Sequence, residues 1–177
     1  DIIFEQDDIQ QTVGGCWRCE TPVEFIPTKQ WFVETLEHKN ELIDLGEEIE
    51  WYPQYYRQRY KDWVQNLKWD WCISRQRDYG VPFPVWYCQD CGNVVVAEVD
   101  DRPIDPMREG YQCDGCGSTD LEPERDVMDT WMTSSLTPQI SGKWIEDDEL
   151  FEKIFPMSLR PQSHDIIRTW AFYTILK

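Results

Sequence analysis

Six of the seven cysteines in this chain occur in three C-x-x-C pairs. Two of these pairs are separated by a stretch long enough for a hairpin, and a glycine follows each of them. A C-x-x-C turn lets two thiolates reach one ion, and two such turns complete a tetrahedron. Glycine at the next position permits the positive φ at which backbone amides can face the sulfurs. The pattern predicts one structural zinc ion bound by Cys88, Cys91, Cys113 and Cys116, in preference to four unrelated buried cysteines.

The third pair, Cys16 and Cys19, has no matching pair in the sequence. We interpret it as half of a second metal site whose other half lies outside these 177 residues. Two free thiols or a disulfide are the alternatives. The remaining cysteine, Cys72, lies between tryptophans and is expected to be a small buried hydrophobe. The first residues lack the pattern of a signal peptide, which favours metal binding over a disulfide framework.

Apolar spacing indicates the elements that must position these cysteines. Residues 28–60 have roughly helical spacing, with interruptions expected at Gly46 and at residues 51–53. A second helix is predicted over 54–67, where Pro53 would occupy the first turn. Between the two paired cysteine turns we expect a hairpin, with residues 94–97 leading out and the segment near Tyr111 returning. Residues 126–135 and 155–177 are each predicted to form a strand or turn followed by a helix.

The charge balance limits the partners, because 34 acidic residues face 17 basic ones and give a net charge of -17. Most of such a surface repels phosphates and should not bind nucleic acid. The carboxylates are spread along the chain, which favours a solvated acidic surface of the halophilic type over a docking face for a basic partner. No run of about 18 apolar residues occurs, so we expect no membrane segment and a cytoplasmic location. The length suits one medium domain or two small ones.

Three segments carry a family resemblance: W-D-W-C-I-S-R-Q-R at 69–77, D-V-M-D-T-W-M-T-S-S at 126–135 and L-R-P-Q-S-H-D-I-I-R-T-W at 159–170. C-W-R-C-E-T-P at 16–22 and K-Q-W-F at 29–32 extend it over essentially the whole chain. The chain resembles valyl-tRNA synthetases, which are class I aminoacyl-tRNA synthetases, in their archaeal form. Isoleucyl-tRNA synthetases typically have D-V-W-F-D-S-G and D-Q-x-R-G-W-F at the corresponding places. The valine enzymes are therefore favoured.

The resemblance implies a mixed α+β or α/β fold in which a zinc-ribbon module joins part of a Rossmann-like catalytic core. Residues 1–50 would be the exit of an editing insertion and a connector with half a zinc knuckle, and 51–84 a helical connector that re-enters the catalytic core. Residues 85–125 would be the zinc ribbon, and 126–177 part of the second half of the core. The implied parent enzyme is a ligase that takes valine, ATP with magnesium and the valine tRNA. This segment would contact the remainder of the synthetase chain.

The two signature strings of class I activation, H-I-G-H and K-M-S-K-S, are absent from these residues. Catalysis by this class depends on positioning and on charge stabilisation, so a partial site should give no measurable rate. We therefore expect the 177 residues to be inactive alone. A pocket that selects valine by apolar fit rejects threonine by only about a hundredfold, which is why the family carries an editing domain. Apart from connecting residues, that editing site is not expected here.

The resemblance also implies roles for single residues. It places Trp131 and Trp170 as walls of the valine side-chain pocket and Asp165 at the adenylate ribose. From the residues alone, core packing would explain the tryptophans, and a carboxylate at a helix N-terminus would explain Asp165. Ser163 stands where the family commonly has glycine. Four arginines are candidates for tRNA contact, with ion pairs to carboxylates as the alternative: Arg57, Arg59, Arg75 and Arg77.

Other function classes stay open at this point. A stand-alone zinc-ribbon binding module would need a basic or aromatic surface near the ribbon, whereas residues 98–126 are rich in Asp and Glu. An oxidoreductase using Cys16 and Cys19 as a redox pair would need a thioredoxin-like βαβ pattern around them, and none is recognisable. The corresponding segment of an isoleucyl-tRNA synthetase is the nearest alternative within the family.

Overall fold

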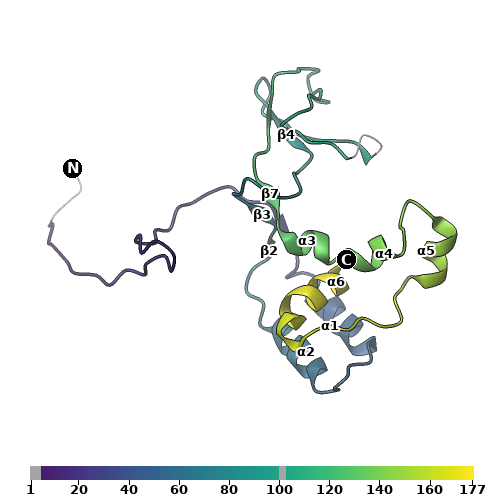
Figure 1. The fold of residues 1–177 in the computed structure, drawn as a ribbon. Coiled ribbons are helices and arrows are strands. Elements are labelled where there is room, and N and C mark those ends of the chain that lie inside the picture. Colours follow the sequence, from purple (N-terminus) through teal and green to yellow (C-terminus); the bar gives the residue numbers. More distant parts are fainter. Residues whose placement is uncertain (1–4, 100–102) are drawn as a thin grey trace.

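The computed structural model describes residues 5–99 and 103–177 (Figure 1). In chain order the elements are β1 (Phe32–Val33), α1 (Lys39–Glu48), α2 (Tyr56–Gln65), β2 (Trp71–Cys72), β3 (Ser74–Arg75), β4 (Val85–Cys88), β5 (Val94–Val96), β6 (Leu121–Pro123), β7 (Val127–Met128), α3 (Thr130–Ser134), α4 (Thr137–Ser141), α5 (Asp148–Ile154), the short 3-10 turn η2 (His164–Ile166), the π-helical turn η3 (Ile167–Ala171) and α6 (Phe172–Leu176). Figure 1 shows a helical body, a small β module standing away from it, and residues 5–30 extending from both.

The strands form three small sheets, ordered β1-β2, β3-β7 and β5-β4-β6. Every strand pair in the described ranges is antiparallel. The sheet β3-β7 pairs Ser74 with Met128 and Arg75 with Val127, so it closes the base of the β module that lies between these two strands in the sequence. The mixture of helices and strands agrees with the expected α+β class. The Rossmann-like arrangement stays a prediction, because it requires parallel strands.

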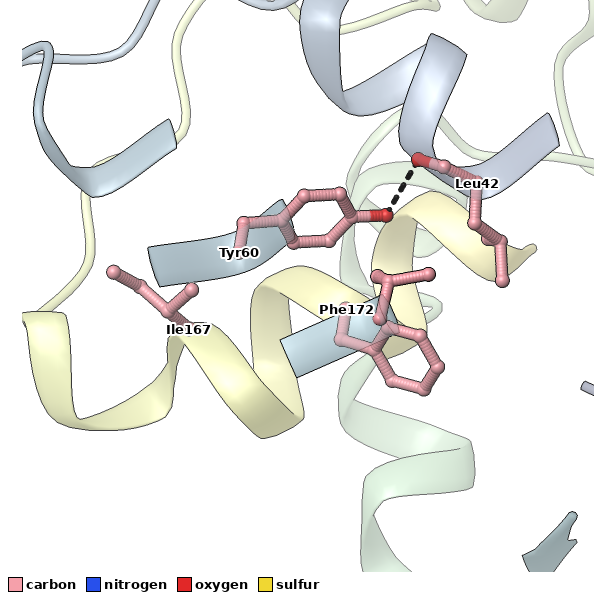
Figure 2. Close-up of a cluster of buried hydrophobic side chains, with 5 residues drawn as sticks. Leu42, Tyr60, Ile167 and Phe172 are labelled. Carbon is pink, nitrogen blue, oxygen red and sulfur yellow. Dashed lines mark hydrogen bonds between the residues drawn. The ribbon is translucent and has the colours of Figure 1, made fainter. Parts of the chain in front are cut away.

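The helical body is held by a buried cluster of Leu42, Tyr60, Val64, Ile167 and Phe172. These residues come from α1, α2, η3 and α6, which are far apart in the sequence. Each such side chain contributes about 1.5–3 kcal/mol when it leaves water. The Tyr60 hydroxyl is also buried, and it donates a hydrogen bond to the Leu42 carbonyl oxygen at 2.9 Å (Figure 2). One polar atom is thereby satisfied inside an apolar cluster.

The interruption expected at Gly46 is wrong, because Gly46 lies buried inside α1. A Cβ at this position would collide with the Tyr60 ring. Glycine therefore allows α1 and α2 to approach each other closely, and it does not end the helix. The second predicted helix is confirmed, with its ends at Tyr56 and Gln65, but Pro53 lies before the helix and not in its first turn.

The strand-to-helix prediction for 126–135 is also confirmed, because β7 leads directly into α3. The predicted hairpin between the cysteine pairs is wrong in its return strand. Strand β5 pairs with β4, and β6 at Leu121–Pro123 covers the other edge of β4. The segment near Tyr111 lies alongside without forming a strand. Its Tyr111 ring stacks on Trp86, with centroids 4.9 Å apart, and its hydroxyl accepts the Glu98 amide. None of the helices in the described ranges is long and apolar enough to cross a bilayer.

Candidate metal centre and amino-acid pocket

The β module brings four thiols together. The Sγ atoms of Cys88, Cys91, Cys113 and Cys116 all lie within 4.8 Å of one another. Two pairs join opposite turns, Cys88 with Cys116 and Cys91 with Cys113, each with 3.6 Å between the Sγ atoms. A disulfide would require about 2.05 Å. The edge of a tetrahedron with zinc–sulfur bonds of about 2.3 Å is about 3.8 Å, so the spacing fits a single ion held by four thiolates.

The backbone of both turns is arranged in the same way. In each, the amide of the following glycine donates to the carbonyl oxygen of the first cysteine, Gly92 to Cys88 at 2.9 Å and Gly117 to Cys113 at 2.8 Å. Both glycines have positive φ, 73° and 76°. This confirms the reason for glycine at these positions. The left-handed residue turns the chain so that the following amides face the cysteine sulfurs.

Polar side chains tie the two turns to each other. Asn93 Nδ2 donates to Asp114 Oδ1 at 2.8 Å, and Ser118 Oγ donates to Asp90 Oδ2 at 2.5 Å. Each bond joins one turn to the other, so the two turns are cross-linked by protein groups. Beneath them, Trp86, Val95 and Ala97 are almost fully buried and pack with the inner thiols, Cys88 and Cys113. The cluster therefore has a small apolar base and a polar rim.

The electrostatics of the thiols favour a bound cation. The backbone amides of Cys91 and Asp90 lower the pKa of the Cys88 thiol to about 7, against the opposing effect of burial. The Ser118 amide acts in the same direction on Cys116, but hydrogen bonds with the Cys91 and Cys88 thiols outweigh it and raise that pKa to about 12. One negative charge is thus stabilised by the backbone, while further charges repel one another. A divalent cation supplies the attraction that several adjacent thiolates need.

The lone pair Cys16 and Cys19 has the same local backbone. The Glu20 amide donates to the Cys16 carbonyl oxygen at 2.8 Å, and Glu20 has φ of 59° in the position that glycine takes elsewhere. The Cys16 amide donates to the Thr21 carbonyl oxygen, as the Cys88 amide does to Asn93. Hydrogen bonds with Thr21 lower the pKa of the Cys19 thiol. Within 5–99 and 103–177, no third Cys, His, Asp or Glu approaches this pair closely enough to share an ion.

The surroundings of Cys16 and Cys19 do not resemble a redox domain. Within residues 5–31 the chain forms only an isolated β-bridge between Gly15 and Pro22, and no helix follows the cysteines. Cys72 is half-buried, and its thiol contacts Gln30 and the Ser74 carbonyl oxygen.

The tryptophans of the expected amino-acid pocket lie on adjacent elements. Trp131 is the second residue of α3 and packs against the cluster around Trp71 and Phe83. Trp170 lies in η3, and its Nε1 donates to the Ser134 carbonyl oxygen in α3 at 2.7 Å. Both indoles are half-buried. The two rings are therefore linked through α3, and no ring contact joins them among the described residues.

Asp165 is exposed at the start of η2, where the Ser163 hydroxyl lies 3.1 Å from its carboxylate. The Ser163 side chain also caps this turn. His164 lies between α2 and Asp165, with Nδ1 at 3.2 Å from both Arg59 Nη1 and Asp165 Oδ1. Asp165 therefore stands at a helix start with an accessible carboxylate.

The four arginines have different surroundings. Arg57 is exposed on α2, and Arg59 Nη1 lies 3.2 Å from Nδ1 of the His164 ring. Arg75 is paired with the buried Asp129, with Nη2 at 2.8 Å from Oδ2. Arg77 is exposed in the segment after β3.

Sequence reasoning missed two residues that organise this region. Asp129 caps the N-terminus of α3, and its carboxylate also accepts the Trp71 indole N–H at 3.1 Å. An aspartate immediately before a helix is a capping signal that the sequence does display. Arg160 has no such signal. Its guanidinium lies over the Trp170 ring, 3.9 Å from the centroid, a contact made between segments that the sequence does not connect by any period.

Comparison with known proteins agrees with the motifs. A family model described as tRNA synthetases class I (I, L, M and V) matches residues 4–177. The valine–tRNA ligase of Methanocaldococcus jannaschii is 54% identical over 175 residues, which is 99% of this chain and 20% of that protein. The valine–tRNA ligase of Thermoplasma volcanium is 54% identical over 178 residues, 99% of this chain and 22% of that protein.

Among solved structures, a ternary complex of agnB2 LeuRS from Agrobacterium radiobacter K84 with tRNA and LeuAMS has 26% identity and a TM-score of 0.47, covering 60% of this chain and 16% of that one. The chain spans about a fifth of the length of the curated relatives named above. The resemblance to valyl-tRNA synthetases is confirmed by these relatives. Because the family model matches nearly every residue, the chain belongs to the class I tRNA synthetases (I, L, M and V).

Proposed function

We propose that these residues are a segment of a longer valine–tRNA ligase, which activates valine with ATP and magnesium and transfers it to the valine tRNA. The observation that carries the proposal is the 54% identity to valine–tRNA ligases over 99% of the chain. The relatives at 54% identity are valine enzymes, which favours valine over isoleucine, the alternative within the family. Because tRNA would be its substrate, we place the enzyme in the cytoplasm.

Within that enzyme we assign residues 1–50 to the exit of the editing insertion and a connector, and 51–84 to the helical connector that re-enters the core. Residues 85–125 would be the zinc ribbon, and 126–177 part of the second half of the catalytic core. The rest of the synthetase chain would supply the H-I-G-H and K-M-S-K-S elements and the editing site. Contact with that remainder is part of the proposal.

The four clustered thiols would hold zinc. Their tetrahedral spacing and their all-sulfur chemistry fit this ion. Four thiolates leave no open position for water, so zinc would stabilise the β module and take no part in the reaction. The module lies between β3 and β7, which pair with each other, and β7 leads into α3, which carries Trp131.

The pair Cys16 and Cys19 would be half of a second zinc site, completed by two ligands elsewhere in the longer chain. Support comes from its backbone, which repeats the hydrogen bonds of the two clustered turns. A Cys16→Ser variant tests this directly. It should remove one zinc ion from the longer synthetase and none from the 177-residue chain, measured as zinc per protein. Equal zinc in wild type and variant of the longer protein would contradict the half-site.

The amino-acid pocket would be bounded by Trp131 and Trp170. Aromatic walls make an apolar cavity, and a branched aliphatic side chain gains by leaving water in it. Asp165 would accept hydrogen bonds from the ribose of the adenylate, for which its exposed carboxylate at η2 is suited. Activation would then be achieved by holding the valine carboxylate in line with the ATP α-phosphorus.

The tRNA would be contacted weakly by Arg57, Arg59, Arg75 and Arg77. Arg57 and Arg59 have the better support, because neither pairs closely with a carboxylate in the described residues, whereas the Arg75 side chain is engaged by Asp129. The acidic remainder of the surface would repel phosphates and confine the nucleic acid to such basic positions.

The decisive experiment is amino-acid-dependent exchange of pyrophosphate into ATP by the longer protein. We expect exchange with valine, much weaker exchange with isoleucine, and none from the 177-residue chain alone. A preference for isoleucine would assign the enzyme to the neighbouring specificity. Valine-dependent exchange by the isolated segment would show that it contains a complete site, and no exchange by the longer protein would favour a zinc-binding module without ligase activity.

A further inference from the structure

Trp170 is held on both its face and its edge. The Arg160 guanidinium lies over the ring, with Cζ 3.9 Å from the centroid. The indole N–H, at the edge, donates to the Ser134 carbonyl oxygen at 2.7 Å. An indole fixed by two contacts in different directions cannot rotate about its side-chain torsions without breaking one of them.

The two contacts are joined into a closed circuit by Thr137. Arg160 Nη2 donates to Thr137 Oγ1 at 3.2 Å, and that hydroxyl donates to the same Ser134 carbonyl oxygen at 2.7 Å. The circuit therefore connects α3, the start of α4, the segment before η2, and η3. Each member restrains its neighbour, so the orientation of Trp170 depends on all of them.

The surroundings of Arg160 are unfavourable for its charged side chain. Its Nε is buried without a hydrogen-bond partner, and burial lowers the pKa of the guanidinium. It forms no ion pair in the described residues, although the chain has 34 carboxylates. Leaving a buried donor unpaired is unfavourable, and the aromatic face is the main group that offsets it here. A buried and partly unpaired guanidinium calls for an explanation, and the contact that it makes with the Trp170 ring supplies one.

A second pair in the same body provides a comparison. Arg168 lies over Trp63 at 5.7 Å, and the Arg168 side chain is exposed. Among the hydrogen bonds of the described residues, none joins Arg168 to α2, the helix that carries Trp63. Both pairs join an arginine to a tryptophan. Only the pair of Arg160 and Trp170 is also held by hydrogen bonds to α3 and α4, so only this pair restrains the orientation of its indole.

We propose that Arg160 and Thr137 form a clamp that sets the orientation of Trp170 and thereby determines which amino-acid side chain the pocket accepts. The inference rests on the proposed function, because it takes Trp170 as a pocket wall. Arg160 and Thr137 are positioning residues that act through Trp170. If the Trp170 ring shifts by a fraction of an ångström, the space left for the amino-acid side chain changes by about one methyl group. A methyl group is worth roughly 10- to 200-fold in specificity.

The test uses the full-length synthetase in valine-dependent pyrophosphate exchange, with KM for valine and for ATP measured separately. Arg160→Gln should raise the KM for valine about tenfold, as expected for the loss of one desolvated cation–π contact, and should leave the KM for ATP within about twofold. The preference for valine over isoleucine should fall by a similar factor. Arg160→Lys keeps the charge but loses the planar guanidinium. Its KM for valine should lie between that of Arg160→Gln and that of wild type.

Thr137 gives an independent pair of variants. Thr137→Val removes the hydroxyl at nearly constant volume and should lower the preference for valine over isoleucine, but less than Arg160→Gln does. Thr137→Ser keeps the hydroxyl and should keep the wild-type preference. Arg168→Gln is the matched control and should leave both KM values and the selectivity unchanged. The Thr137 pair decides the matter if Arg160→Gln fails to fold.

The clamp is overturned if Arg160→Gln and Arg168→Gln have the same kinetics. It is equally overturned if the KM values for valine and ATP rise in parallel, since that pattern indicates general loss of structure. Failure of the proposed function would look different, because wild-type full-length protein would then show no valine-dependent exchange at all.

Discussion

The clustered turns around Cys88 and Cys113 differ from the lone turn at Cys16 in their surroundings and hardly at all in their backbone. All three have the same amide-to-carbonyl hydrogen bonds and a residue with positive φ after the second cysteine. Two of them meet because strands β4 and β6 bring them together over a buried base, and the third lies in an exposed segment. A metal-binding turn is therefore a local property, whereas a complete coordination sphere depends on tertiary structure.

The largest effect should follow removal of a buried ligand. Cys113, which is 2% exposed, lies at the base of the cluster, and Cys113→Ser should remove one zinc ion and unfold the β module. Structural zinc sites of this kind contribute about 10–16 kcal/mol in zinc-finger peptides, so loss of one thiolate cannot be compensated by the small apolar base. Zinc per protein and circular dichroism check the result.

Cys72→Ser is the matched control, because that thiol lies outside the cluster and should leave the zinc content unchanged. Full retention of zinc by Cys113→Ser would show that the four thiols are not its ligands.

The next largest effect distinguishes the apolar base from the exposed turn. Trp86 is 1% exposed and stacks on Tyr111, whereas Trp17, within the lone pair, is 84% exposed. Trp86→Ala should destabilise the module by about 3–5 kcal/mol, while Trp17→Ala should change stability by less than about 0.5 kcal/mol. Urea unfolding followed by circular dichroism measures both. Similar small changes in the two variants would indicate that the base does not support the cluster.

The local half of this comparison could be predicted from the sequence. The C-x-x-C pairs, the positive φ of Gly92 and Gly117, the helix at Tyr56–Gln65 and the step from β7 into α3 all depend on residues that are close in the chain. Periodicity and turn chemistry carry this information because they act over a few residues.

What the sequence did not predict depends on distant contacts. An interruption was expected at Gly46 because the contact that explains this glycine, its close approach to Tyr60, exists only when α1 and α2 pack together. The return strand was misplaced because Leu121–Pro123 is short and its pairing with β4 is set by packing around Trp86. The contact of Arg160 with Trp170 joins a loop to a π-helical turn, and no spacing rule anticipates it.

A smaller effect should follow from the glycine after the first clustered pair. Gly92 has φ of 73° and no atom within 4 Å of an added Cβ, so a substitution there acts through the backbone alone. Gly92→Ala should cost about 1–2 kcal/mol, which corresponds to roughly a tenfold weaker zinc affinity. Competition with a chromophoric chelator measures the affinity.

Glu20→Gly is the counterpart in the lone turn, where glutamate already adopts φ of 59°. It should relieve backbone strain without changing the unfolding of the helical body. A zinc affinity of Gly92→Ala equal to that of wild type would mean that the turn can adopt another backbone conformation around the ion.

The smallest effect concerns Glu124, which joins the β module to the segment that carries Trp31. One carboxylate oxygen accepts hydrogen bonds from the Trp31 indole, just before β1, at 2.9 Å and from the Tyr87 hydroxyl in the β module at 2.5 Å. The other accepts the backbone amides of Arg125 and Asp126. Burial opposes the charge, but these donors outweigh it and hold the pKa of Glu124 below its ordinary value of 4.5.

A carboxyl group whose pKa is lower in the folded state contributes stability above its unfolded pKa and loses it as pH falls. The contribution of Glu124 should therefore be complete at neutral pH and should disappear as pH falls below about 4.5 and through the lower folded value.

Glu124→Gln should cost about 1 kcal/mol at pH 7, allowing for partial exposure of the carboxylate, and should flatten the pH dependence in this window. Glu122→Gln, an exposed neighbour on β6 with only a distant pairing to Arg125 at 3.8 Å, is the matched control and should preserve the wild-type slope. Urea unfolding at pH 7 and at pH 4 measures the slopes. If Glu124→Gln and wild type lose stability equally on acidification, the Glu124 carboxylate does not stabilise the contact between the Trp31 segment and the β module.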